Sequence, residues 1–231
     1  STGSHIIAIK NDGTLWGWGQ QGGEGRLGDG SLSNKSSPVQ VGTLNTWIDV
    51  AVGSNHTMGI TNDSVLYTWG SGTFGQMGDG TNNNRPTPFL LGYNFKKVFA
   101  GNNTSIAIDN SNYTYIWGDN TNGLMPGDIV GVHRSSIGLL NSETTWNSFS
   151  IEQHILARKK DNTLYAWGLN NVGQLGLGDT TNRSSPVQVG ASNWSQISAG
   201  VSYSLGITTD NSLYAWGLNN NGQLGLSDTV N

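Results

Sequence analysis

The chain has 231 residues, with 34 glycines, nine tryptophans and no cysteine, so it is long enough for one large all-β domain and offers no thiol chemistry. Only 11% of its residues are charged and its net charge is −4, so it lacks the basic field that attracts nucleic acid. No apolar run approaches the length of a membrane span, and we expect neither nucleic-acid binding nor membrane insertion.

One stretch of the sequence occurs in two nearly identical copies. Residues 161–180 and 210–229 are identical at seventeen of twenty positions and begin 49 residues apart. A period of this size is typical of repeat architectures.

The repeat can be aligned on a Trp-Gly pair, which recurs at spacings of 48 to 51 residues. The pairs begin at Trp18, Trp69, Trp117, Trp167 and Trp216. Thirteen residues before them stand His5, His56, Thr104, His154 and Tyr203. Ten residues before them stand only small residues, namely Ala8, Gly59, Ala107, Ala157 and Gly206.

Each repeat predicts four short strands. Two runs flank a polar turn and form a hairpin signal, as at 203–207 and 213–216. A glycine-bounded turn follows, a proline opens a third run, as at 186–189, and an aromatic residue opens a fourth. Four-stranded units in tandem predict an all-β fold, a β-propeller with about 50 residues per blade.

The combined motif resembles the regulator-of-chromosome-condensation repeat. The motif comprises the His-x-x-Ala-Ile, Leu-Tyr-x-Trp-Gly, Gly-Gln-Leu-Gly and Pro-Val elements, and it covers nearly the whole chain. The resemblance implies a propeller, commonly of seven blades. Five copies of the first half of the repeat and four of the second are present, so we expect 4.5–5 blades of a larger propeller. Further propeller chain or other subunits would complete it.

We expect a single repeat domain over residues 1–231. Its approximate units are 5–55, 56–103, 104–153, 154–202 and a partial unit over 203–231.

No constellation of catalytic, cofactor-binding or metal-ligating residues stands out. Three of the four histidines occupy one repeat column, and most aspartates lie in turns, where they bond their own backbone. One branch of the family senses ultraviolet light through clustered tryptophans, but all nine tryptophans here belong to repeat columns. We therefore expect no enzyme activity, no cofactor and no metal.

The third repeat departs from the pattern, and departures of this kind often mark functional sites. Its glycine turn reads Gly-Leu-Met-Pro, and Glu152 stands where other repeats have glycine. We take five residues as a candidate partner surface. They are His133, Arg134, Glu152, Arg158 and Lys159.

The leading hypothesis is a non-catalytic binding or structural module with a protein or carbohydrate partner, at an extracellular surface or in a virion assembly. The resemblance implies two alternatives, a guanine-nucleotide exchange factor for a small GTPase and a secreted enzyme inhibitor. Against exchange, the even spacing leaves no room for the inserted wedge that this branch uses.

Overall fold

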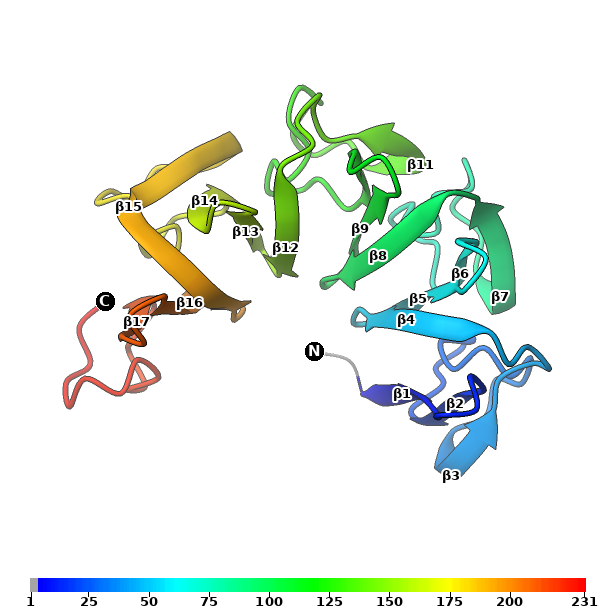
Figure 1. Ribbon diagram of the computed structural model, residues 1–231. Helices are drawn as coiled ribbons and strands as arrows, with labels where there is room; N and C mark the ends of the chain where they lie inside the picture. Colours follow the sequence, from blue (N-terminus) through cyan, green and yellow to red (C-terminus); the bar gives the residue numbers. More distant parts are fainter. Residues whose placement is uncertain (1–3) are drawn as a thin grey trace. The chain divides into compact units, whose positions relative to one another are not determined.

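The computed structural model describes residues 4–231, and residues 1–3 of the predicted repeat domain lie outside this description. Within residues 4–231 the chain forms seventeen β-strands and no helix (Figure 1). The predicted all-β fold is confirmed.

The strands form antiparallel sheets in which each strand pairs with its neighbours along the chain. The first sheet contains β1 (His5–Ile9), β2 (Leu15–Gly19) and β3 (Lys35–Gln40). The second contains β4 (Trp47–Val52), β5 (His56–Thr61), β6 (Leu66–Gly70) and β7 (Arg85–Gly92). The third contains β8 (Phe95–Ala100), β9 (Thr104–Asp109), β10 (Thr114–Gly118) and β11 (Arg134–Leu139).

The last two sheets share a strand. The fourth contains β12 (Trp146–Ile151), β13 (His154–Lys159), β14 (Thr163–Gly168) and the first part of β15 (Arg183–Ala199). The second part of β15 pairs with β16 (Tyr203–Thr208), which pairs with β17 (Leu213–Gly217). Each sheet corresponds to one blade.

Two details differ from the sequence interpretation. The complete sheets begin at the aromatic residue of the fourth run, such as Trp47, one strand earlier than the predicted units. The outermost strands begin at a basic residue, such as Lys35 or Arg183, three residues before the proline that was expected to open them. Proline is tolerated inside these strands because an outermost strand has one edge that needs no N–H donor.

The strands divide between two compact units. The first unit comprises residues 1–119 and 133–144, and the second comprises 120–132 and 145–231. The first unit therefore holds three sheets, and the second holds the fourth and fifth sheets with the loop of the third repeat.

The column of small residues is explained by the ring of the fourth run. A Cβ atom on Gly59 would lie 2.6 Å from the Trp47 ring, and one on Gly206 would lie 2.4 Å from the Trp194 ring. In the second sheet, the Trp47 ring makes edge contacts with Tyr67 and Trp69, at centroid distances of 5.2 and 5.9 Å. A small residue beneath the ring is thus required for this packing.

Neighbouring blades are joined through one backbone carbonyl of the glycine turn. The Gln76 carbonyl accepts a hydrogen bond from Trp117 Nε1 at 2.9 Å and another from Ser105 Oγ at 2.9 Å. The Gln174 carbonyl likewise accepts from Trp216 Nε1 and Ser204 Oγ. In both cases the donors belong to the next blade, so the turn is fixed by two bonds to one oxygen.

The residues of the histidine column add a further hydrogen bond to the contact between neighbouring blades. Three pairs join a ring Nε2 to a hydroxyl of the next blade: His5 with Thr57, His56 with Ser105 and His154 with Ser204. Each hydroxyl also donates to a carbonyl of the glycine turn, so its single proton is already used. The histidine must therefore donate through Nε2–H, which makes each ring the neutral Nε2–H tautomer.

Burial keeps these rings neutral. Desolvation lowers the pKa of His5 to about 4, of His56 to about 3 and of His154 to about 4. The Nδ1 atom of each ring is buried without a hydrogen-bond partner, so a second proton would be stranded there. The three histidines therefore have a structural role, which is to link neighbouring blades by hydrogen bonds.

Replacing Gly59 with valine should destabilise the protein by about 1–3 kcal/mol, because the new side chain overlaps the Trp47 ring. Gly23 is the matched control, since it is exposed and its Cβ position meets nothing within 4 Å. Urea unfolding of both variants measures the difference. Equal midpoints for the two would contradict the packing argument.

Stability should fall as the pH is lowered from about 6.5 toward 4. The three histidines have a folded-state pKa below that of the unfolded chain, so their contribution is complete above pH 6.5 and lost on acidification. Burial raises the pKa of Asp49 and Glu152, which offsets part of the loss. Urea midpoints between pH 7 and 4.5 measure this, and His154→Gln should show a shallower dependence. A flat profile in the unmodified protein would count against the neutral rings.

Candidate functional site

The junction between the third and fourth repeats lacks both partners of the histidine pair. Thr104 stands in the histidine column of the third repeat, and Ile155 of the fourth stands where other repeats have Thr57, Ser105 or Ser204. The Thr104 hydroxyl instead donates to the Asp119 carbonyl at 3.1 Å. The repeat that departs in its loop therefore also departs in its junction residues.

The loop after β10 is the most distinctive surface of this repeat. Its side chains are aliphatic and exposed, with 75% of Ile129, 53% of Val130 and 55% of Val132 accessible to solvent. The corresponding loop of the fourth repeat carries Thr180 and Thr181. Contiguous exposed apolar side chains are typical of interaction sites, whereas a single one is ordinary.

The backbone of this loop is held by one buried side chain. Asn120 is fully buried, its amide nitrogen donates to the Ile129 carbonyl at 3.1 Å, and its amide oxygen accepts from the Met125 N–H at 2.9 Å. The Gly131 N–H in turn donates to the Asn120 carbonyl. The aliphatic side chains are thus presented from a fixed backbone.

Two of the predicted partner-surface residues lie in the first unit. His133 Nδ1 is 3.3 Å from the Asp119 carboxylate, and the ring meets Phe74 edge-on at 5.1 Å. Arg134 begins β11 and donates from Nη1 to the Ile116 carbonyl at 3.3 Å, with its guanidinium group over Gly138. Both side chains are partly exposed. Arg134 makes its contacts within its own blade, whereas His133 also contacts Phe74 of the second blade.

The other three lie in the second unit, on the β12–β13 hairpin. Glu152 is in the turn at one end, and its burial raises the pKa of its carboxyl group. Arg158 is at the other end, where Nη1 donates to Asn162 and to the Trp194 carbonyl. Lys159 points to the opposite face, with its ammonium group over the rings of Trp146 and Tyr165.

The hairpin residues therefore form no single patch. Arg158 and Lys159 are neighbours in a strand, and neighbouring side chains point to opposite faces. The turn itself is one residue shorter than elsewhere: the Glu152 N–H donates to the His154 carbonyl, whereas the Gly53 N–H donates to the His56 carbonyl. The sequence interpretation selected these charges but missed Ile129, Val130 and Val132, which an aliphatic run within a turn-rich loop could have signalled.

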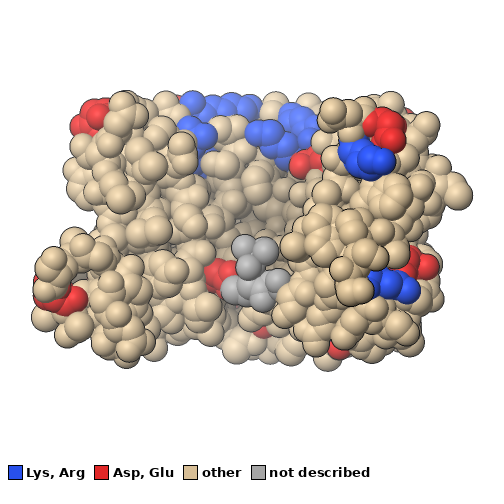
Figure 2. All heavy atoms as spheres, turned by 90° about the horizontal axis from the view of Figure 1, so that it is seen from below, with Lys and Arg blue, Asp and Glu red and all other residues tan. Residues whose placement is uncertain are grey.

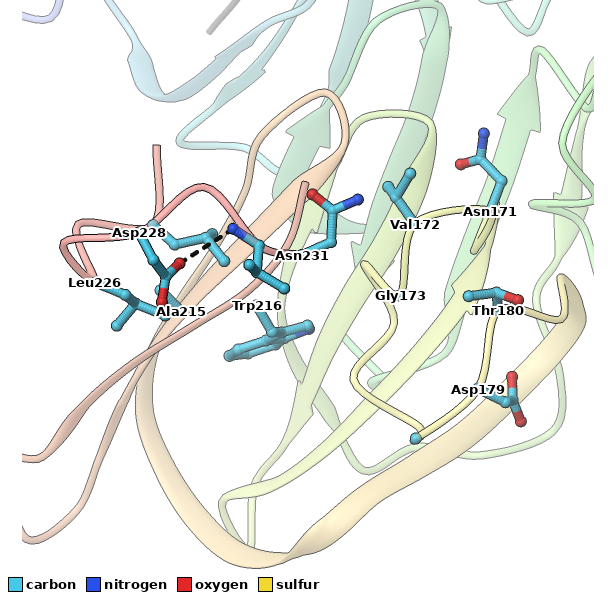
Figure 3. Close-up of a pocket in the computed structure, with 14 residues that line it drawn as sticks. Asn171, Val172, Gly173, Asp179, Thr180, Ala215, Trp216, Leu226, Asp228 and Asn231 are labelled. Carbon is cyan, nitrogen blue, oxygen red and sulfur yellow. Dashed lines mark hydrogen bonds between the residues drawn. The ribbon is translucent and has the colours of Figure 1, made fainter. Parts of the chain in front are cut away.

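A cavity of about 600 Å³ lies in the second unit beside β17. Figure 3 shows Trp216 between the loop that carries Val172 and Gly173 and the C-terminal segment that carries Leu226 and Asp228. Its wall is mixed, with aliphatic groups, one indole ring and two carboxylates.

Neither a candidate metal site nor a candidate membrane-spanning helix is found among the described residues. Between residues 4 and 231, no three histidine, aspartate or glutamate side chains form a group that could hold a metal ion. None of the described residues forms a helix long and apolar enough to cross a membrane. Most of the face seen in Figure 2 carries neither acidic nor basic side chains, in keeping with the low charge of the sequence.

Comparisons with known proteins match the repeat pattern. The ultraviolet-B receptor UVR8 of Arabidopsis thaliana is 32% identical over 210 residues, which cover 80% of this chain and 44% of that protein. The E3 ubiquitin-protein ligase HERC2 of Homo sapiens is 36% identical over 104 residues, or 42% of this chain and 2% of that protein.

Among solved structures, yeast RCC1 (Prp20), bound to Kap60, has a TM-score of 0.87 at 19% identity. The superposed region covers 99% of this chain and 57% of the Prp20 chain. This likeness shows the propeller fold. The chain thus spans about half the length of UVR8 and of the Prp20 structure.

A family model described as an RCC1-like domain matches residues 1–231. This match covers the whole sequence, and the repeat columns, the antiparallel sheets and the likeness to a solved propeller agree with it. The chain belongs to the RCC1-like domain family.

Proposed function

We propose that the chain is a non-catalytic protein-binding module that contacts its partner through the third-repeat loop, residues 127–132. The observation that carries this proposal is the exposure of Ile129, Val130 and Val132 on a backbone fixed by Asn120. A fixed loop loses little conformational entropy when it binds, so more of the contact energy appears as affinity.

The chemistry of the loop favours a protein partner over a carbohydrate. Aliphatic side chains gain free energy mainly by burial against other apolar groups. Two structures of relatives support this class of partner. Yeast RCC1 (Prp20) has been solved bound to Kap60, and Prp20p has binding properties to Gsp1p and histones.

The residues selected from sequence take a secondary place in this proposal. Arg134 and His133 follow the loop directly in the chain, but they belong to the first unit and are not part of the proposed contact. Arg158 donates to the Trp194 carbonyl of the next blade, and Lys159 supports its own blade through Trp146 and Tyr165. The side chains of Trp69, Trp117 and Trp167 are fully buried in the blades, which argues against light reception of the kind named for UVR8.

Replacing Ile129 and Val132 together with serine should weaken partner binding by about tenfold or more, because truncated contact residues at an interface centre cost over 1 kcal/mol each. Binding to immobilised Kap60, Gsp1p and histones measures the effect. Leu32→Ser is the matched control, since Leu32 is 58% exposed in the equivalent loop of the first repeat. Thermal unfolding should be unchanged in both variants.

Two outcomes would count against the proposal: equal binding by the double variant and the unmodified chain, or saturable binding to a glycan but to none of the three proteins. A nucleotide-release assay with Gsp1p tests the exchange-factor alternative. Release no faster than background removes that alternative. Light scattering tests assembly, since large particles formed without a partner favour a structural role.

A further inference from the structure

Two blades place a lysine of their own over an aromatic ring, near the aspartate of a hairpin turn. In the first blade, Lys10 Nζ is 4.8 Å from the centre of the Trp16 ring and 4.0 Å from the Asp12 carboxylate. In the fourth blade, Lys159 Nζ is 4.2 Å from the centre of the Tyr165 ring. A cation in this position is attracted by the negative face of the ring.

These lysines occupy one column of the repeat. Lys10 and Lys159 both stand eight residues before the tryptophan of the Trp-Gly pair, with the turn aspartate six and the aromatic residue two residues before it. In the fourth sheet Lys159 lies opposite Trp146, whose ring centre is 5.0 Å from Nζ. Hydrogen bonds from Thr163, and in smaller part the charge of Lys159, lower the pKa of the turn residue Asp161. The column thus forms a site for an ammonium group, which in these blades is filled from within the chain.

The second blade has the same rings and carboxylate but no lysine. Trp47 and Tyr67 meet edge-on at a centroid distance of 5.2 Å, and the corresponding pair of the fourth blade does so at 5.4 Å. Thr61 stands in the lysine column, opposite Trp47, and its hydroxyl donates to the Asp63 carboxylate. Within residues 4–231, no basic side chain lies over the Tyr67 ring or forms an ion pair with Asp63.

A second tyrosine lies beside this position. Tyr93 is 67% exposed in the turn after β7. The turn is fixed against the hairpin of the second blade, because the Phe95 N–H donates to the Ser64 carbonyl at 3.0 Å. Burial raises the pKa of the Tyr67 hydroxyl, and the neighbouring Asp63 and Tyr93 raise it further. The two tyrosines and the aspartate therefore lie close together at one end of the second blade.

We propose that Asp63, Tyr67 and Tyr93 form a binding site for a lysine side chain of a partner protein. The ammonium group lies over the Tyr67 ring and beside the Asp63 carboxylate, in the position that Lys159 takes in its own blade. The Tyr93 ring covers the aliphatic part of the bound side chain. These three residues, the lysine site, belong to the first unit, and the proposal is independent of the loop at residues 127–132.

The chain's own lysines and the free carboxylate oxygen specify the occupant. Oδ1 of Asp63 accepts from the Thr61 hydroxyl, whereas Oδ2 accepts no hydrogen bond from residues 4–231. An ammonium group has three N–H donors, so it can bind this oxygen while it lies over a ring. An apolar side chain would leave the carboxylate without a partner, and an acidic one would be repelled by it.

The test uses the 231-residue chain and a short peptide, acetyl-Gly-Ser-Lys-Ser-Gly-amide, with norleucine in place of lysine in the matched peptide. In an NMR titration, the lysine peptide should shift the resonances of the lysine site saturably. Half-saturation should lie in the millimolar range, because few ligand atoms make contact. The norleucine peptide should bind more than about fivefold more weakly, since it has neither a charge for the ring nor one for the carboxylate.

Asp63→Asn and Tyr93→Ser should each weaken binding of the lysine peptide by about two- to fivefold. The matched controls are Asp12→Asn, whose carboxylate already neighbours Lys10, and Tyr113→Ser, which removes a tyrosine that is 39% exposed in the third blade. Both controls should bind the peptide like the unmodified chain. Asp63→Asn should leave the weak binding of the norleucine peptide unchanged, which separates a charge contact from a loss of folding.

Thr61→Lys should fill the site from within the chain. The new side chain stands in the column of Lys10 and Lys159, so it should lie over Tyr67 and abolish binding of the lysine peptide. Thr61→Val is the matched control, because it removes the same hydroxyl but supplies no ammonium group, and it should retain binding. Thermal unfolding checks that both variants fold, and the Asp63 and Tyr93 variants decide the question if either does not.

Three results would overturn the proposal. They are no saturable shift at about 50 mM lysine peptide, equal binding of the lysine and norleucine peptides, or equal binding by the unmodified chain and Asp63→Asn. Equal losses in Tyr93→Ser and Tyr113→Ser would also refute it, because binding would then be a general property of exposed tyrosines. A folded Thr61→Lys variant that binds the peptide as tightly as the unmodified chain would have the same meaning.

Discussion

In two of the glycine turns, one carbonyl oxygen organises the junction with the next blade. The oxygen of Gln76 or Gln174 receives an indole N–H and a hydroxyl from the next blade, and the hydroxyl in turn accepts from a histidine of the same blade as the turn. In a buried setting, each of these groups would be costly without its partner. The turn must therefore keep its shape, which explains the glycines with positive φ on both sides, such as Gly75 and Gly78.

The third repeat shows what happens when this constraint is relaxed. Thr104 replaces the histidine and Ile155 replaces the hydroxyl that would accept from it. Because both members of the pair are absent, neither is left buried without its partner. The two departures are mutually consistent, as a hydrogen-bonded pair replaced on both sides is less costly than one replaced on a single side. The loop of the same repeat carries the exposed side chains of Ile129, Val130 and Val132, so this repeat departs from the pattern both in its junction and in its loop.

Much of the fold could be predicted from the sequence, because strand order, turns and blade identity depend on local pattern. The columns also predicted the structural role of His56 and the need for a small residue at Gly59. Ser105 was not identified as the partner of His56, since pairing across 49 residues depends on how neighbouring sheets meet. The Trp47 ring was not identified as the group beside Gly59, since that contact depends on the register between β4 and β5. The candidate surface was harder to predict than the fold. The charged residues Arg158 and Lys159 stood out in the sequence, but as neighbours in a strand they point to opposite faces of the sheet.

The shared strand β15 has a consequence for unfolding. Residues 183–193 pair with the fourth sheet and residues 194–199 with the fifth, without a loop between them. Repeat proteins usually unfold unit by unit, with a free-energy term for each unit and each boundary. Here the boundary is a continuous backbone, so opening β16 and β17 exposes amide groups of a strand that still belongs to the preceding blade. The fourth and fifth blades should therefore exchange their amide protons as one cooperative block.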